Sequence, residues 1–472
     1  MNIKRVLLLR INSLILEEVN HPHQFYPPFL LKYIQAILNK KAVYQTQLID
    51  CYVRPIPFNS LLGESLQCLP DMVVIFFASL NANLSLKYAR AIKERCASII
   101  TVAVGPEITL NYQNYCNSEL DFILPGEVEK EVPMLIENLN RQDLKSAQKT
   151  YDYRDNRKAA LVYNINELPI PAYSLDELFA YRFLYPIKTN KKLVWGHILA
   201  NRGCSHKCIF CSQNTRESFS KEVRIRSVSN VAGEIQNLLC AGANFISFAD
   251  DDFTISNEFV YSLCNEIKDR GLRIQWTAQA RIDEVDYGLL ETMKEVGCAL
   301  LAFGIESGSK RIINILNKND FNIDWIEKAK IVFKICRELG IATVALFIIG
   351  NPTEKEEDIR ESIKLAKELN PDIIQVHFFT LYPGSPAYQQ YRDKITGNFS
   401  NLYHYAQPVI NVSDIDLKKL ERMQVNFYRN FLLRPNFIFN NLFTYTPFYF
   451  HNKDVFWILC KKTLRLILGN NS

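Results

Sequence analysis

The sequence lacks long apolar runs and any strong excess of one charge. No stretch of 18 apolar residues occurs in its 472 residues, so no transmembrane helix is expected. The 55 basic and 50 acidic residues leave a net charge of only +5, which is too diluted to indicate a nucleic-acid partner. Apolar residues make up 48% of the chain, enough for the cores of two or three domains. These features favour a globular, multi-domain protein.

The sequence also lacks a disulfide framework and an export signal. Nine of its twelve cysteines are scattered singly, as small buried apolar residues often are. The apolar run Val6–Leu9 is interrupted by Arg10, and no small-residue cleavage site follows it. We therefore expect a cytoplasmic protein whose cysteines stay reduced.

The other three cysteines lie close together in the sequence. Cys204, Cys208 and Cys211 have the spacing C-x3-C-x2-C in the segment NRGCSHKCIFC. Three soft thiolates on one short loop suit an iron–sulfur cluster, and no fourth cysteine lies near enough to close the site. One metal position would therefore stay open. A zinc site that recruits His206 is the alternative, although His206 lies inside the loop, where simultaneous ligation is awkward.

This spacing, with the aromatic Phe210 just before the third cysteine, resembles the signature of the radical S-adenosylmethionine (radical SAM) enzymes. The resemblance implies that Cys204, Cys208 and Cys211 hold three irons of a [4Fe–4S] cluster and that the fourth iron chelates S-adenosylmethionine (SAM). It also implies an electron donor such as flavodoxin or ferredoxin. Reductive cleavage of SAM would give methionine and a 5′-deoxyadenosyl radical that abstracts hydrogen from an unactivated carbon. The metal and cofactor supply this chemistry, while the protein orients them.

Residues 1–145 alternate short apolar strands with helix-length patterns. The strands are expected at Val6–Leu9, Gln47–Ile49, Met72–Phe77, Ile99–Val104 and Phe122–Leu124. Such alternation predicts a doubly wound parallel sheet with helices on both faces and a ligand site beyond the strands' carboxyl ends. Small and polar residues stand there, as a phosphate- or amide-bearing ligand requires: Ser79, Asn81, Gly105, Gly126 and Glu127. The same residues could simply form the turns.

The N-terminal segment resembles the cobalamin-binding domain that precedes the radical SAM barrel in one large subfamily. The similarity lies in the segments 26–31, 104–106 and 121–127. The resemblance implies a cobalamin site at the strand-end residues named above. The D-x-H-x-x-G motif, which supplies a histidine ligand to cobalt in many such domains, is absent. Cobalt without a lower protein ligand and a domain that has lost cobalamin are both compatible with that departure.

Residues 146–189 are expected to form a linker, since Glu167–Tyr173 resembles the proline-containing linker between the two domains of this subfamily. Residues 190–385 contain six further strand patterns. These strands are expected at His197–Ala200, Phe245–Phe248, Arg273–Ala278, Leu300–Gly304, Thr343–Ile349 and Ile373–Phe379. Helices are expected between them, for example at Trp325–Leu339 and Glu356–Leu369. Six βα units are fewer than the eight of a closed barrel. We therefore expect a partial (β/α)6 barrel, open on one side, with the cysteine loop after its first strand.

Further motifs stand at the ends of these strands. The carboxylates of segment 250–252 could orient a ligand amine or cap a helix. Arg281 is suited to a carboxylate such as that of the methionine moiety of SAM. By resemblance, Glu306 and Ser307 lie near SAM, and Gly350 belongs to the glycine-rich strand on its adenine side. Each residue singly could be a turn, a cap or a surface pair, and no catalytic residue is assigned.

Residues 386–472 form a mainly helical tail that is rich in aromatic residues. From Arg422 onward the sequence has seven lysines and arginines against one acid, Asp454. A basic amphipathic segment of this kind could lie on an anionic membrane surface or bind a lipid-like substrate. The alternative is a tail that packs its aromatic residues on the barrel and leaves its lysines in solvent.

Together these features predict a radical SAM enzyme with cobalamin, most simply a C-methyltransferase acting on a small-molecule or lipid-like substrate. In the subfamily's commonest reaction one SAM methylates cobalamin and a second gives the radical. Non-methylating oxidation, cyclisation or ring contraction is the alternative within the class, and a cobalamin- and cluster-binding module without turnover lies outside it. A methylthiotransferase is disfavoured because the N-terminal segment has no second cysteine triad.

Overall fold

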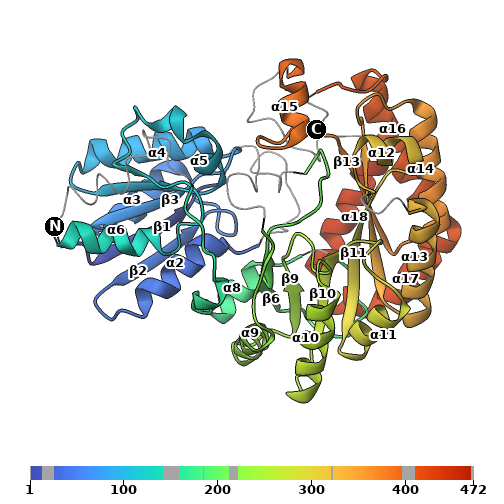
Figure 1. The fold of residues 1–472 in the computed structure, drawn as a ribbon, viewed down its shortest axis with the longest axis horizontal. Coiled ribbons are helices and arrows are strands. Elements are labelled where there is room, and N and C mark those ends of the chain that lie inside the picture. The colour runs from blue at the N-terminus through green and yellow to red at the C-terminus, as the bar shows by residue number, and fades with distance from the viewer. Residues whose placement is uncertain are drawn as a thin grey trace. The chain divides into compact units, whose positions relative to one another are not determined.

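The computed structural model describes residues 2–12, 26–141, 159–183, 185–211, 222–319, 323–395 and 410–468. Within these ranges, the residues up to Tyr173 together with residues 222–224 form one compact unit. The other described residues form a second unit. Each unit contains its own parallel sheet (Figure 1).

The first unit is built on a five-stranded parallel sheet of order β2-β1-β3-β4-β5. Its strands are β1 (Arg5–Arg10), β2 (Gln45–Asp50), β3 (Met72–Phe76), β4 (Ile100–Val104) and β5 (Phe122–Ile123). Its helices are α2 (Phe29–Asn39), α3 (Phe58–Gln67), α4 (Ala82–Arg95), α5 (Pro106–Asn111) and α6 (Glu131–Asn140), with the short 3-10 helices η1 (Tyr112–Tyr115) and η3 (Ile165–Glu167). Side chains of α2 and α6 pack in one apolar cluster, and those of α3, α4 and α5 pack in another. The predicted doubly wound sheet is therefore confirmed.

The second unit is built on six parallel strands in the order β13-β12-β11-β10-β9-β6. The strands are β6 (Trp195–Ile198), β9 (Phe245–Phe248), β10 (Gln275–Ala280), β11 (Cys298–Glu306), β12 (Ala342–Ile349) and β13 (Ile373–Phe378). The two-residue strands β7 (Asn201–Arg202) and β8 (Arg224–Ile225) are separate from this sheet, and Arg224 belongs to the first unit. The helices that alternate with them are α9 (Val228–Cys240), α10 (Asn257–Asp269), α11 (Tyr287–Glu295), α12 (Lys310–Ile315), α13 (Trp325–Leu339) and α14 (Glu356–Leu369). The expected partial (β/α)6 barrel is confirmed.

Local sequence signals fix where these helices begin and end. The side chains of Asp286 and Asp324 accept a hydrogen bond from a backbone N–H in the first turn of α11 and α13, which satisfies a donor that the helix leaves open. At the other end, Gly340 closes α13 in the left-handed conformation, with φ of 68°. The periodic patterns between these signals place α13 and α14 at the residues expected from the sequence.

The remaining helices are α8 (Leu175–Ala180), α15 (Pro386–Tyr391), η5 (Arg392–Lys394), α16 (Leu417–Leu432), α17 (Pro435–His451) and α18 (Lys453–Leu468). The last three form the C-terminal tail, drawn in red in Figure 1. Phe448 of α17 and Val455 of α18 are buried in an apolar cluster with Trp195 and Phe245 of the sheet. The inner side of the tail therefore belongs to the core of the second unit.

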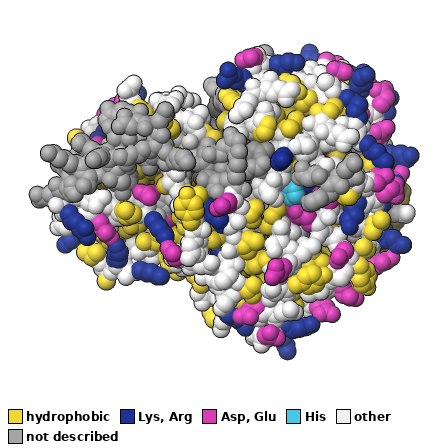
Figure 2. Space-filling model, viewed as in Figure 1, with side chains coloured by type: hydrophobic (Ala, Val, Ile, Leu, Met, Phe, Trp, Pro, Cys, Tyr) yellow, Lys and Arg dark blue, Asp and Glu magenta, His cyan; other side chains and the backbone are white. Residues whose placement is uncertain are grey.

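The visible surface of each unit mixes charges of both signs, as Figure 2 shows. That distribution matches the small net charge of the sequence. In the part of the chain that the structure describes, no helix is both long enough and apolar enough to span a bilayer.

A buried histidine makes the second unit sensitive to acid. His197 on β6 is 2% exposed, and its Nε2 lies 3.0 Å from the carbonyl oxygen of Tyr181. Burial lowers the pKa of His197 from its ordinary value near 6.5 to about 4. The unfolded chain therefore binds a proton at a higher pH than the folded chain does. The stability contributed by neutral His197 is complete above about pH 6.5 and is lost as the pH falls toward 4.

We expect His197→Gln, which can still donate to the Tyr181 carbonyl, to remove about 3 kcal/mol of this acid sensitivity between pH 7.5 and pH 4. The measurement is the free energy of unfolding in urea at both pH values, compared with the wild type. His451→Gln at an exposed position is the control and should keep the wild-type difference. An unchanged pH dependence in His197→Gln would show that His197 is not the group responsible.

Candidate functional site

The three clustered cysteines lie in the loop that follows β7. Cys208 is buried, and the other two are partly buried. The loop backbone is held at Ile209, whose N–H donates to the carbonyl of Leu316 at 3.0 Å. The carbonyl of Ile209 in turn accepts from the N–H of Ala387 at 3.0 Å. The loop is therefore fixed between the end of α12 and the start of α15, two segments far from it in sequence.

Phe210 supports the same loop through its side chain. It packs, partly buried, against an apolar cluster that contains Ile312, Leu316 and Leu381. This contact anchors the residue next to the third cysteine. A direct contact between Phe210 and a cofactor, as expected from the sequence, stays a prediction.

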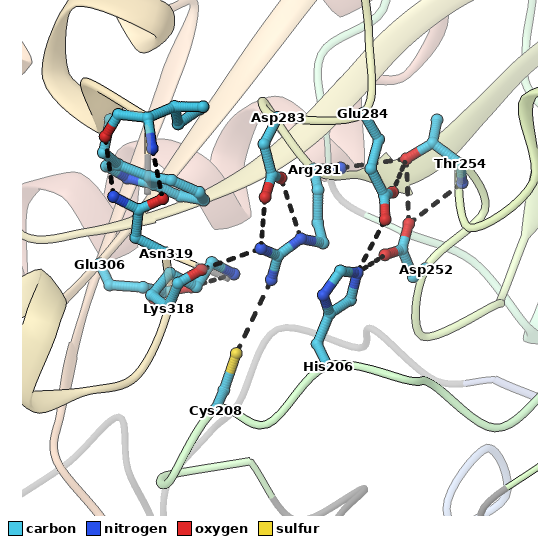
Figure 3. A network of polar contacts seen from close by, with 12 residues as sticks. His206, Cys208, Asp252, Thr254, Arg281, Asp283, Glu284, Glu306, Lys318 and Asn319 are labelled. Atoms are coloured by element: carbon cyan, nitrogen blue, oxygen red, sulfur yellow. Dashed lines mark hydrogen bonds and ion pairs between the residues drawn. The ribbon is translucent and has the colours of Figure 1, made fainter. Parts of the chain in front are cut away.

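His206 ties the cysteine loop to the ends of two strands (Figure 3). Its Nε2 lies 2.7 Å from Oε1 of Glu284 and 3.3 Å from Oδ2 of Asp252. The Thr254 hydroxyl lies 2.9 Å from the Asp252 carboxylate and 2.8 Å from that of Glu284. Asp252 and Thr254 follow β9, and Glu284 follows β10. The imidazole therefore completes a buried polar network rather than standing free in the loop.

One group of side chains in the described residues has the spacing of a single metal ion. Ligand atoms of Cys204, His206 and Asp252 all lie within 4.8 Å of one another. A four-iron cluster separates its cysteine ligands more widely, because each thiolate binds a different iron. Burial raises the pKa of the Cys204 thiol to about 12. A thiolate at this position therefore depends on a bound cation.

Arg281, at the end of β10, is surrounded by partners (Figure 3). Its Nε and Nη2 donate to the two carboxylate oxygens of Asp283 at 3.0 and 2.6 Å, and Nη2 also donates to the carbonyl of Lys318 at 2.9 Å. The third nitrogen, Nη1, lies 3.7 Å from the sulfur of Cys208. The indole of Trp325 lies against the guanidinium, 5.5 Å away. Arg281 thus joins the strand end to the cysteine loop.

Lys318 is a site residue that sequence reasoning missed. Its Nζ lies 3.0 Å from Oε1 of Glu306, and both side chains are less than a tenth exposed. Burial works against the charged form of Lys318, but Glu306 and Cys208 act together in the opposite direction and raise the pKa of the lysine above its usual value. No motif surrounds Lys318 in the sequence, and only its position after α12 brings it to Glu306. The result is a buried pair of opposite charges beside Arg281 and Cys208.

Backbone geometry makes room for this ion pair. Glu306 ends β11 in the left-handed region, with φ of 64°, where the register between β11 and β12 also shifts. A Cβ added to Gly304 would collide with the carboxylate of Glu306 and would lie 2.9 Å from Nζ of Lys318. The glycine therefore leaves the space that the two charged groups occupy.

Ser307 and Gly350, also expected near a cofactor, have clear local roles. The hydroxyl of Ser307 lies 3.2 Å from that of Ser362 and joins the end of β11 to α14. Gly350 has φ of 79°, and its N–H donates to the buried carboxylate of Glu354. A Cβ on Gly350 would lie 2.7 Å from Cδ2 of Leu420. Both residues shape the strand ends, and their contact with a ligand stays a prediction.

Two buried side-chain oxygens beside the cysteine loop have no hydrogen-bond partner among the described residues. Oδ1 of Asn201 and Oδ2 of Asp250 are buried and form no hydrogen bond with the residues that the structure describes. The other carboxylate oxygen of Asp250 accepts from the backbone N–H of Asn201. Burial raises the pKa of Asp250 to about 8. The Asn201 oxygen therefore suits a hydroxyl or ammonium group of a ligand, whereas the Asp250 carboxyl, mostly protonated at neutral pH, suits a hydroxyl group that can donate or accept.

In the first unit, the expected ligand residues Ser79 and Asn81 contact the unit itself. The Ser79 hydroxyl donates to the Glu107 carboxylate at 2.9 Å. The Asn81 amide donates to the carbonyl of Ile11 at 2.8 Å and accepts from the N–H of Ala78 at 2.7 Å. Asn81 therefore links the loops after β1 and β3, which is a structural role.

Gly105 and Gly126 are also required by contacts within the first unit itself. Their φ angles are 109° and 97°, in the region that favours glycine. A Cβ on Gly105 would lie 2.6 Å from the carbonyl oxygen of Phe77, and one on Gly126 would collide with the backbone of Ala160. The close approach at each glycine is thus made by the protein's own backbone.

Comparison with known proteins identifies the domain that carries the cysteine loop. Residues 198–366 match the model of the Radical SAM superfamily, and this part of the chain is a radical SAM domain. A domain of this family implies a [4Fe–4S] cluster and SAM. The match therefore favours the cluster over the single-ion alternative for the cysteine loop.

Similar proteins extend over most of the chain. An uncharacterized methyltransferase of Pyrococcus horikoshii is 28% identical over 442 residues, which cover 89% of this chain and 91% of that protein. An anaerobic magnesium-protoporphyrin IX monomethyl ester cyclase of Rubrivivax gelatinosus is 24% identical over 428 residues, covering 88% of this chain and 75% of that protein. The fold resembles the radical SAM methyltransferase TsrM of Kitasatospora setae, solved with cobalamin and a [4Fe–4S] cluster bound, with a TM-score of 0.63 at 15% identity over 84% of this chain and 78% of that chain.

Substitution of Glu127 tests whether this residue has a structural role in the first unit. Its carboxylate forms a buried ion pair with Arg224, with oxygen–nitrogen distances of 2.6 and 2.8 Å. We expect Glu127→Gln to lower the free energy of unfolding of the ligand-free protein by about 3–5 kcal/mol, because Arg224 would keep a buried charge without its counter-ion. Urea unfolding followed by circular dichroism measures the change. Glu119→Gln, which breaks the exposed pair with Arg90, should cost less than about 1 kcal/mol. Equal stability of the two variants would contradict a structural role.

Proposed function

We propose that this chain, in which residues 198–366 form a radical SAM domain, is a cobalamin-dependent C-methyltransferase. The observation that carries the proposal is the three-cysteine loop inside that domain, in a chain that also has a doubly wound N-terminal unit. The similarity to the methyltransferase of Pyrococcus horikoshii extends over both units, which supports the choice of reaction. The substrate is an unactivated carbon of a small or lipid-like molecule, and a flavodoxin or ferredoxin in the reducing cytoplasm is the electron donor.

Cys204, Cys208 and Cys211 would hold the cluster. The donor set fits, because three thiols stand on one loop and Arg281 directs an N–H toward one of the sulfurs. When bound, the cluster supplies the electron that cleaves SAM, and cobalamin supplies the methyl carrier. The loop itself contributes fixed ligand positions, held by the backbone of Ile209 and by the His206 network.

Lys318 and Glu306 would bind the methionine moiety of SAM. The moiety carries an ammonium and a carboxylate, and the buried pair offers one partner for each. Arg281, the residue first expected to bind the carboxylate, has its guanidinium engaged by Asp283 and by the Lys318 carbonyl. We therefore assign the carboxylate to Lys318 and a positioning role to Arg281. The buried oxygens of Asn201 and Asp250 would bind hydroxyl groups of the same ligand.

Cobalamin would lie at the strand ends of the first unit. Ser79, Gly105 and Gly126 remain the proposed contacts, whereas the described bonds of Asn81 and Glu127 support the loops around them. Asn12, which follows β1, adds a buried oxygen without a hydrogen-bond partner in the described residues. That acceptor fits an amide-bearing ligand such as cobalamin.

Radical cyclisation is the second candidate. The cyclase of Rubrivivax gelatinosus matches 88% of this chain, nearly the same share as the methyltransferase does. The two reactions differ in the products they leave from SAM. Both reactions release methionine and 5′-deoxyadenosine from SAM, and methyl transfer through cobalamin releases S-adenosylhomocysteine from a second SAM as well.

We expect protein made with cobalamin supplied, and reconstituted anaerobically with iron and sulfide, to retain cobalamin in its optical spectrum. With dithionite and SAM it should release both 5′-deoxyadenosine and S-adenosylhomocysteine, measured by mass spectrometry. Cys208→Ala should lose the cluster absorption and the 5′-deoxyadenosine. Cys240→Ala, an exposed cysteine at the end of α9, should keep both.

Each product pattern decides between the candidates. Absence of cobalamin from the purified protein would overturn the methyltransferase mechanism. Release of 5′-deoxyadenosine without S-adenosylhomocysteine would favour cyclisation, and release of neither would leave a binding module. An unchanged cluster spectrum in Cys208→Ala would overturn the ligand assignment.

The role of Lys318 is tested by SAM binding to the reconstituted protein. Lys318→Met should raise the Kd for SAM about 10- to 100-fold, because the carboxylate loses a charged partner. Gly304→Ala keeps both charges but displaces Glu306, and should also weaken binding. Lys310→Met, on the exposed surface of α12, should leave the Kd unchanged. Equilibrium dialysis gives the Kd, and thermal unfolding confirms that each variant is folded; wild-type affinity in a folded Lys318→Met would contradict the assignment.

A further inference from the structure

The outward side of α17 is unusually apolar for an exposed surface. Sixteen large hydrophobic side chains are exposed in the described residues, and eight of them lie between Leu433 and Leu464. Phe439, Phe443 and Phe450 are 60%, 79% and 69% exposed. No lysine, arginine, aspartate or glutamate occurs from Pro435 to Phe450. Half of the exposed apolar side chains are thus concentrated in about thirty residues of the tail.

These side chains share one side of the helix. Positions 439, 442, 443 and 450 fall within a narrow sector, because an α-helix turns once in 3.6 residues. Tyr445 and Phe448 occupy the opposite sector and are buried. The Tyr445 hydroxyl donates to the carboxylate of Asp372 at 2.7 Å, which fixes the rotation of the helix. The apolar sector is therefore held outward by packing on the other side.

The surface continues onto the start of α18. Nζ of Lys453 lies 5.5 Å from the ring centre of Phe450. Trp457, one helical turn after Lys453, is 69% exposed. We use the name aromatic face for Phe439, Leu442, Phe443, Phe450 and Trp457.

Cations border the aromatic face, and the acidic residue of this part of the sequence is paired. After Arg422 the sequence contains one acidic residue, Asp454, and it forms an ion pair with Arg182. Lys453 and Lys461 are exposed on α18. An uncharged aromatic surface with lysines at its edge is complementary to a layer whose interior is apolar and whose surface is anionic.

We propose that the aromatic face lies on the surface of an anionic lipid bilayer and inserts its phenylalanine and tryptophan side chains among the headgroups. None of the described helices is long and apolar enough to cross a bilayer, so the contact is peripheral. Lys453 and Lys461 pair with anionic headgroups, while α17 stays packed on the barrel through Tyr445 and Phe448. The inference is independent of the proposed reaction.

Vesicle co-sedimentation tests the proposal with the full-length protein. We expect binding to vesicles of phosphatidylglycerol and phosphatidylcholine, weaker binding to phosphatidylcholine alone, and loss of the difference at high salt. The double variant Phe439→Glu/Phe443→Glu should bind at least about tenfold more weakly. Lys453→Glu/Lys461→Glu should lose the preference for phosphatidylglycerol. Ile331→Glu, which places the same charge on the exposed surface of α13, should bind as the wild type does.

Other outcomes would overturn the proposal or assign the aromatic face to a different binding partner. Failure of the wild type to sediment with phosphatidylglycerol vesicles would overturn the proposal, as would equal loss of binding in Ile331→Glu. A dimer by light scattering that Phe439→Glu/Phe443→Glu converts to a monomer, without vesicle binding, would assign the face to a second copy of the chain. Because the substituted side chains are exposed, the variants should retain SAM cleavage. The proposed membrane contact and the proposed reaction can therefore be tested separately.

Discussion

The candidate site depends on the burial of one guanidinium. A buried charge is tolerated only when it is paired and its hydrogen bonds are satisfied. Arg281 meets that demand with a carboxylate from its own loop, the carbonyl of Lys318 and the sulfur of Cys208. The guanidinium therefore joins three segments: the end of β10, the segment after α12 and the cysteine loop. Displacing any of these segments would leave the guanidinium without one of its partners.

The charges around this ion also suit a cationic ligand. Carboxylates outnumber the lysine and arginine in the network that Figure 3 shows. Asp283 pairs with Arg281 and Glu306 with Lys318, while Asp252 and Glu284 lie against His206. A low-dielectric site strengthens the attraction of such an excess for a positive group. The sulfonium and the ammonium of SAM are both cations. Electrostatics and the fold therefore point to the same ligand.

Local sequence patterns predicted the elements of this fold well, because strand periodicity and helix ends are decided by nearby residues. Helices α13 and α14 lie where their patterns placed them. The site was predicted only where its chemistry is local, as in the cysteine spacing. Lys318 could not be found, because its partner Glu306 is brought to it by the turn at the end of β11 and not by a motif. The predicted ligand residue Glu127 meets Arg224, 97 positions away, and no pattern within either segment signals that pair.

The C-terminal tail shows why composition alone left two alternatives open. Aromatic residues favour both a packed core and a lipid interface, and α17 uses them for each purpose on opposite sides. Tyr445 and Phe448 are needed for packing, so their identity follows from the fold. Phe439 and Phe443 make no such contribution, because an exposed position accepts a charged residue at little cost to stability and with a gain in solubility. An uncharged aromatic sector at positions that folding leaves free therefore calls for a binding role.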